Sequence, residues 1–127
     1  GAFDVDNDRR VMTQLPLCDF GEVIDPPTED VTAHVIEALV HCGVPRTDPA
    51  VRRGVEFLRR TQRPDGSWWG RWGVNHVYGT GAVLPALAAA GEDMGAPYVR
   101  RAVEWLAAHQ NPDGGWGESV LSYADPA

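Results

Sequence analysis

The sequence predicts an all-α protein built from two copies of one helical hairpin, and two observations support this fold class. A glutamine-to-tryptophan motif occurs twice, and apolar residues recur at helical spacing inside each copy. Gln62 recurs as Gln110 and Trp68 recurs as Trp116 at the same separation, and the register holds upstream without a gap. A repeat unit of about 48 residues lies in the range of stacked helical pairs.

The chain of 127 residues has the size of one domain, and we expect it to divide into three parts. Residues 1–28 are rich in Asp, Pro and Gly without a sustained period, which predicts an ordered loop segment. The first helix pair is expected within residues 29–69 and the second within residues 77–117. Because repeat architectures usually need roughly three units for stability, we expect the chain to be a piece of a longer protein.

The first inner helix is expected to run from residue 29 to His41. Thr28 can cap its start, acidic residues follow at the positive end of the helix, and Gly43 can end it. Its predicted buried stripe consists of Val31, Val35, Ala38, Leu39 and Cys42.

Proline marks the start of the outer helix in each copy. Pro49 and Pro97 stand at first-turn positions, and Asp48 can cap the first of these helices. Apolar stripes then recur at helical spacing, as Val51, Val55 and Leu58 in one copy and Val99, Val103 and Leu106 in the other.

The second inner helix, at about residues 77–90, is apolar around most of its circumference, so we expect it to lie between other elements. Two successive helix pairs with the inner helix more buried than the outer one predict part of an α/α barrel, or toroid. A solenoid would give the same pattern.

A Pro-Asp-Gly turn follows each outer helix, at residues 64–66 and 112–114. Proline at the second and glycine at the fourth position are typical of a type I turn, so each helix must end there. The preceding glutamine amide is both donor and acceptor. We therefore expect it to pack on the indole that follows the turn and to bond backbone groups at a neighbouring helix end.

Composition excludes several classes of partner and site. A formal charge of −7 and a pI near 4.9 argue against binding to a nucleic-acid backbone or an anionic membrane surface. No apolar run reaches the length of a membrane span, and nothing resembles a signal peptide. Cys18 and Cys42 fit no metal spacing and are expected to be reduced thiols of a cytoplasmic protein. Arg9 and Leu15 stand where an EF-hand needs glycine and glutamate, which argues against a calcium loop at residues 4–15.

Asp30 and His34 lie one helical turn apart and project from one face of the first helix. Two interpretations remain open: a surface ion pair, or an acid that orients a histidine toward a third group in a cavity. His41, His76 and His109 have no partner at comparable spacing, and His109 is assigned to the surface.

Residues 68–80 bring three indoles, a phenol and a guanidinium together between an outer and an inner helix. Core packing explains Trp68. Trp69, Trp72 and Tyr78 lie among glycines, where large rings often anchor a ligand or another segment. Aromatic faces with no nearby cation to stack on would also suit a carbocation, because the ring quadrupole stabilises positive charge.

The repeated Gln-x-Pro-Asp-Gly-x-Trp motif resembles the QW repeat of the triterpene cyclases. Four linking stretches narrow this resemblance: Gly-Ala-Phe-Asp-Val-Asp-Asn at 1–7, Cys-Asp-Phe-Gly-Glu-Val-Ile-Asp-Pro-Pro at 18–27, Asp-Val-Thr-Ala-His at 30–34 and Gly-Arg-Trp-Gly-Val-Asn at 70–75. Together they resemble the bacterial squalene-hopene cyclase family over essentially the whole chain.

The resemblance implies a segment of the α/α barrel domain that carries the catalytic acid of such an enzyme. Enzymes of this family protonate squalene or a similar polyprene. A polycyclic cation then forms along the aromatic walls of the cavity, and proton loss or water capture gives hopene or hopanol. No metal or organic cofactor is implied. The expected partners are the polyprene, the remainder of the barrel and, for the full-length protein, the cytoplasmic side of a membrane through monotopic association; the chain itself is expected to be soluble.

The resemblance also assigns roles to particular residues. His34 matches the histidine that hydrogen-bonds the catalytic acid, Asp30 the aspartate beside it, and Tyr78 a tyrosine near that network. The matching substrate-binding positions are Trp72 and Phe3 in the cavity and Leu17 and Cys18 at the constriction between channel and cavity. Relatives usually carry tyrosine at position 3, so only the stacking role of the ring transfers to Phe3.

One departure concerns the proton donor, which is the middle aspartate of Asp-x-Asp-Asp in this family. Asp4 and Asp6 lie in a similar run, Asp-Val-Asp-Asn at 4–7. The residues around it match a different stretch of the family that itself reads Asp-Val-Asp-Asn, so neither aspartate is assigned as the acid. We therefore expect the chain alone to be inactive, and it could dimerise to cover surfaces meant for absent neighbours. The alternatives are another class II polyprene cyclase, a non-catalytic α/α scaffold or binding module, and a prenyltransferase β-subunit, whose zinc-ligand spacing is missing.

Overall fold

The computed structural model describes residues 26–124, which fold into four α-helices and a short 3₁₀-helix. In chain order these are α2 (Glu29–His41), α3 (Pro49–Thr61), α4 (Asn75–Ala89), α5 (Pro97–Ala108) and the 3₁₀-helix η2 (Val120–Tyr123). The all-α prediction is confirmed, and no strand occurs within this part of the chain.

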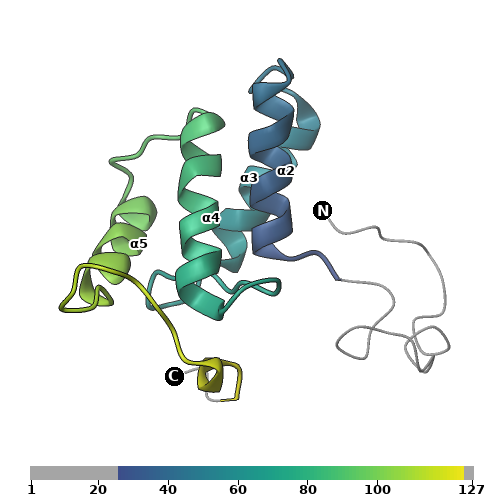
Figure 1. Ribbon diagram of the computed structural model, residues 1–127. Helices are drawn as coiled ribbons and strands as arrows, with labels where there is room; N and C mark the ends of the chain where they lie inside the picture. The colour runs from purple at the N-terminus through teal and green to yellow at the C-terminus, as the bar shows by residue number, and fades with distance from the viewer. Residues whose placement is uncertain (1–25, 125–127) are drawn as a thin grey trace, which may run out of the picture.

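The helices form two hairpins whose inner members lie side by side (Figure 1). α2 and α4 run in the same direction, α3 packs on α2, and α5 packs on α4, so that α4 lies between α2 and α5. This layering of inner and outer helices fits an arc of an α/α barrel.

Local signals set several helix ends as expected, with two exceptions. The Thr28 side chain makes no capping hydrogen bond at the start of α2, and α4 begins at Asn75 rather than at about residue 77. The Asp48 carboxylate accepts a hydrogen bond from the Ala50 N–H at 2.7 Å, and Pro49 opens α3. The inner helices end at Gly43 and Gly91, whose φ angles of 88° and 78° belong to the left-handed region that favours glycine.

The predicted stripe of the first outer helix forms the centre of the core. Val51, Val55 and Leu58 are buried, as is Trp68, the tryptophan of the first turn. In the second copy the prediction is only partly right, because Val99 is buried but Val103 is 51% exposed. Among the described residues no third hairpin follows α5, so nothing comparable covers its far side.

The predicted buried stripe of α2 is only partly right: Val31 and Leu39 are half-buried, and Leu39 packs against the core. Val35 is 42% exposed and Ala38 and Cys42 are exposed, whereas the buried positions are Asp30, Thr32, Ala33 and Ile36. α2 packs on both α3 and α4, and it approaches α3 closely at Ile36: a Cβ added at Gly54 would lie 2.8 Å from Ile36 Cδ1. Close approach, rather than hydrophobicity alone, therefore selects the buried face.

The two glutamine-to-tryptophan motifs form the same hydrogen bonds. The Trp68 indole donates to the Leu58 carbonyl at 2.7 Å, and the Trp116 indole donates to the Leu106 carbonyl at 2.8 Å. Each glutamine amide donates across its own turn, at 2.9 Å from Gln62 to the Gly66 carbonyl and at 2.7 Å from Gln110 to the Gly114 carbonyl. The sequence repeat is thus a structural repeat.

Gln62 also connects the two hairpins. Its amide donates to the carbonyl of Tyr98 in the first turn of α5 at 2.8 Å, and its carbonyl accepts from the Arg101 guanidinium at 2.9 Å. The predicted bond to a backbone group at a neighbouring helix end is therefore confirmed for Gln62, whereas packing of the amides on the indoles stays a prediction.

Candidate functional site

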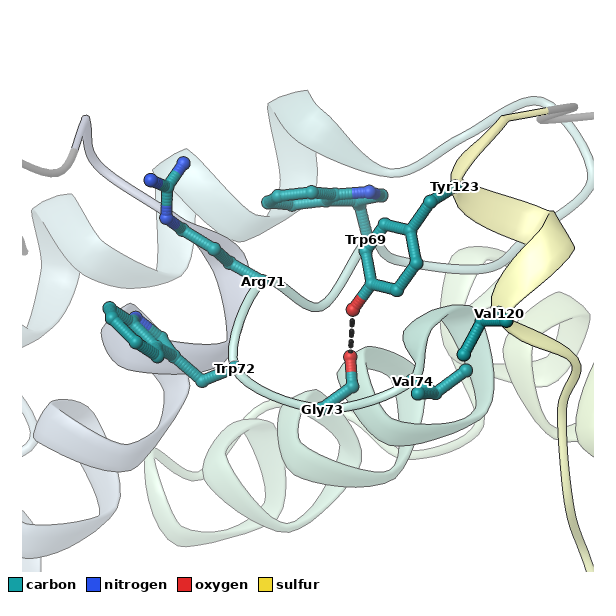
Figure 2. A pocket seen from close by; sticks show the side chains of 7 residues that line it. All are labelled: Trp69, Arg71, Trp72, Gly73, Val74, Val120 and Tyr123. Atoms are coloured by element: carbon teal, nitrogen blue, oxygen red, sulfur yellow. Dashed lines mark hydrogen bonds between the residues drawn. The ribbon is translucent and has the colours of Figure 1, made fainter. Parts of the chain in front are cut away.

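The loop between Trp68 and α4, residues 69–74, borders a pocket of about 480 Å³ (Figure 2). We refer to residues 69–74 as the aromatic loop. The pocket is lined by Trp69, Arg71, Trp72, Gly73, Val74, Val120 and Tyr123. Its lining is mainly apolar, as expected for a site that accepts a hydrocarbon.

Asp30 fixes one side of the aromatic loop from the start of α2. One carboxylate oxygen accepts the N–H groups of Arg71 at 3.0 Å and Trp72 at 2.9 Å, and the other accepts the Val31 N–H at 2.9 Å. Asp30 is fully buried. Both interpretations of the Asp30–His34 pair are therefore wrong in this respect: the carboxylate bonds backbone N–H groups inside the protein, and the hydrogen-bonding partner of His34 is Tyr78 rather than Asp30.

The ring of Tyr78 fixes the middle of the loop from α4. A Cβ at Gly70 would lie 2.6 Å from Tyr78 Cδ1, and a Cβ at Gly73 would overlap the same ring. Glycine at both positions therefore lets the loop backbone wrap around the phenol.

Tyr123 holds the opposite side of the loop from η2. Its hydroxyl donates to the Gly73 carbonyl and lies 3.3 Å from the Gly70 carbonyl (Figure 2). Its ring meets Trp69 edge to face, with centroids 6.3 Å apart and an interplanar angle of 86°. The pocket wall is therefore built from two segments far apart in the sequence.

His34 and Tyr78 meet at the edge of this arrangement. His34 Nε2 lies 3.3 Å from the Tyr78 hydroxyl, and the two rings are tilted at 54° with centroids 6.2 Å apart. His34 is otherwise exposed. Burial raises the pKa of Tyr78, and the negative charge of Asp30 raises it further, so the phenol stays protonated at neutral pH.

Trp72 differs from expectation in one respect. Its side chain is 48% exposed, and the Arg71 guanidinium lies 6.0 Å from its ring centroid. Figure 2 shows Trp72 on the side of the loop away from Tyr123. The expectation of aromatic faces without a nearby cation is therefore wrong for this ring.

The remaining predicted site residues fall elsewhere. Phe3, Leu17 and Cys18 lie outside the described residues. His109 is exposed, as assigned, and stacks on Trp105 with centroids 3.9 Å apart. Cys42 is an exposed free thiol at the end of α2.

Sequence reasoning missed two residues that shape the site: Tyr123, and Glu118, whose carboxylate accepts the N–H groups of Asn75 and Val77 at the start of α4. No sequence signal pointed to Glu118, because the helix was expected to begin at about residue 77 and position 74 was not recognised as the residue before it. Nothing in the spacing of Tyr123 indicated that its hydroxyl would reach the aromatic loop.

Two helical hairpins, each ending in a glutamine-to-tryptophan turn, with their inner helices side by side, have the architecture of an α/α barrel segment. The family model for the squalene-hopene cyclase C-terminal domain matches residues 1–127, and the chain belongs to this family.

Curated relatives agree with this assignment. The chain is 64% identical over its whole length to a squalene-hopene cyclase of Alicyclobacillus acidocaldarius, of which it covers 20%. It is 48% identical over 84 residues to a squalene-hopene cyclase of Schizosaccharomyces japonicus, and 36% identical over 92 residues to a dammaradiene synthase of Dryopteris crassirhizoma. These two matches cover 66% and 65% of the chain and 13% of each relative.

Proposed function

We propose that this chain forms part of the cavity wall of a squalene-hopene cyclase, which converts squalene to hopene or hopanol through a proton-initiated carbocation cascade. The observation that carries the proposal is the contact between His34 and Tyr78, whose ring packs against Gly70 and Gly73 of the aromatic loop. The match to squalene-hopene cyclases over the whole chain supports it.

In this proposal His34 and Tyr78 support the acid that protonates the polyprene. A tyrosine that remains protonated can donate to His34 Nε2, which leaves Nδ1 as the ring nitrogen that carries a proton. That N–H can donate to a carboxyl group and hold it in position for proton transfer. Asp30 contributes indirectly, because it positions the backbone of Arg71 and Trp72.

The aromatic loop contributes a wall that does not react with a cation. Trp69 and Tyr123 present ring surfaces to the pocket, and Val74 and Val120 complete an apolar boundary. Ring faces stabilise a passing positive charge without forming a bond to it. Rigid anchoring by Asp30 and Tyr123 keeps these surfaces in place during the cascade.

Turnover of squalene by the full-length protein that carries this chain tests the proposal. Hopene or hopanol should be detected by mass spectrometry, and His34→Ala should lower kcat strongly. The matched control is His41→Ala, an exposed histidine two turns along the same helix, which should retain activity. A folded protein that binds squalene without converting it would instead favour the binding-module alternative.

We also propose that residues 1–127 alone do not cyclise squalene, because the sequence contains no Asp-x-Asp-Asp run. Incubation of the chain with squalene should give no hopene, and its formation would contradict this. No helix in the described region is long and apolar enough to cross a membrane. We propose peripheral membrane association for the full-length protein by analogy with its family.

A further inference from the structure

The start of α4 has no cap of its own, although it carries the proposed site residue Tyr78. Val74 precedes the helix and offers no side-chain acceptor. The first turn of a helix leaves N–H groups without intrahelical partners, and these need an acceptor from elsewhere. Here the acceptor lies more than forty residues further along the chain, in the segment after the second turn.

Glu118 supplies this acceptor. One of its carboxylate oxygens accepts the N–H of Asn75 at 3.1 Å and the N–H of Val77 at 2.8 Å. Burial would raise the pKa of Glu118, but the backbone donors Val77 and Asn75, with Ser122 and His76, hold it below its usual value. The group is therefore an ionised carboxylate at the positive end of α4.

The capped turn leads directly to the proposed site. Tyr78 immediately follows Val77, and its ring fills the space left by Gly70 and Gly73 in the aromatic loop. Asn75 is fully buried, and its side-chain carbonyl accepts from the Gly70 N–H at 3.4 Å. Any displacement of this turn would move the Tyr78 hydroxyl relative to His34.

We propose that Glu118 is a positioning residue for the cyclisation: it caps α4 and thereby sets the distance between the Tyr78 hydroxyl and His34. The proposal rests on the proposed function of that pair. Glu118 acts through the first turn of α4, where it accepts the N–H groups of Asn75 and Val77. A residue that follows the second Pro-Asp-Gly turn thus positions a site built by the loop that follows the first.

The test uses the full-length protein with squalene and compares Glu118→Ala, Tyr78→Phe and the double variant. Glu118→Ala should lower kcat about threefold to tenfold with little change in KM, as should Tyr78→Phe. The double variant should be no worse than Tyr78→Phe alone, because both changes act through the same hydroxyl. Fold-losses that multiply in the double variant would overturn the proposal, as would unchanged kcat in Glu118→Ala.

Two further variants separate positioning from a general loss of stability. Glu118→Gln keeps an acceptor oxygen and should restore most of kcat. Asp48→Ala removes the cap of α3, a helix that does not carry Tyr78, and should leave kcat within about twofold of the wild type. Equal losses of kcat in Asp48→Ala and Glu118→Ala would show that Glu118 contributes stability alone.

Amide hydrogen exchange tests, independently of turnover, whether Glu118 holds the first turn of α4 in place. Peptides covering residues 70–79 should exchange faster in Glu118→Ala than in the wild type, and less so in Glu118→Gln. Unchanged exchange would overturn the proposal. If the wild-type protein fails to convert squalene, the proposed function fails, and the exchange data still establish or refute the control of this turn by Glu118.

Discussion

The buried carboxylate of Asp30 joins two segments that lie far apart in the sequence. It accepts three backbone N–H groups, one from its own helix and two from the aromatic loop. A carboxylate is suited to this position because it offers only acceptors. An amide of the same shape would direct a donor at one of these N–H groups.

Asp30→Asn should therefore destabilise the chain, by about 1–3 kcal/mol in the free energy of unfolding, because buried donors lose their acceptor. Chemical denaturation followed by circular dichroism measures this loss. Asp48→Asn is the matched control, since Asp48 is a partly exposed cap and asparagine caps helices about as well. Similar losses for the two variants would contradict the role assigned to Asp30.

His76 makes stability depend on pH. It is 7% exposed, and burial lowers its pKa below the ordinary value of 6.5; Arg63 acts in the same direction, whereas the charges of Glu118 and Asp65 oppose the shift. The unfolded chain thus binds a proton at His76 more readily than the folded chain does. The stability from neutral His76 is complete above pH 6.5 and falls as the pH drops below it.

Replacement of this histidine should reduce the pH dependence. Between about pH 7.5 and 5.5, the midpoint of thermal unfolding should fall in the wild type and fall less in His76→Gln. The lowered pKa values of Asp65 and Glu118 act in the same direction, but at more acidic pH, below their ordinary values of 3.8 and 4.5. If the unfolding midpoint fell equally with pH in both proteins, His76 would not be the source of the pH dependence.

At the scale of elements, the aromatic loop depends on how closely its backbone can approach Tyr78. Gly73→Ala should disrupt the loop, because the new Cβ would overlap the Tyr78 ring. We expect a loss of about 1–3 kcal/mol in unfolding free energy. Gly81→Ala is the control: nothing lies within 4 Å of its Cβ, so α4 should gain up to about 1 kcal/mol.

Denaturation of both variants provides the comparison, and a stable Gly73→Ala protein would mean that the loop does not wrap Tyr78.

Local sequence signals predicted the elements themselves well. Pro49 with Asp48 marked the start of α3, and Gly43 marked the end of α2, because caps and turns depend on adjacent residues.

Features that depend on approach between elements were not predictable in the same way. The predicted buried face of α2 was only partly right, because the sequence does not show that Gly54 leaves space for Ile36 while Val35 and Ala38 stay exposed. The contact of His34 with Tyr78 joins residues 44 positions apart, and only the family resemblance placed them together. The contact of Tyr123 with the aromatic loop joins residues 50 positions apart, and neither the sequence pattern nor the resemblance placed them together.

At the scale of the whole molecule, the two glutamines differ in what they connect. Gln62 bonds its own turn and also reaches Tyr98 and Arg101 of the second hairpin, whereas Gln110 bonds its own turn. Gln62→Ala should cost about 1–3 kcal/mol of unfolding free energy, and Gln110→Ala about 1 kcal/mol or less. Urea denaturation of both variants tests this order, and the reverse order would contradict it.

The most direct test of the cyclase assignment is kcat for squalene in the full-length protein after Tyr78→Phe, compared with Tyr98→Phe. Tyr98 lies on the outer helix, where its hydroxyl donates to Glu92 away from the pocket. Tyr78→Phe should lower kcat about threefold to tenfold, the effect of one hydrogen bond, with KM little changed. Tyr98→Phe should keep the wild-type kcat. Equal kcat values in the two variants would contradict a role for the His34–Tyr78 contact in proton transfer.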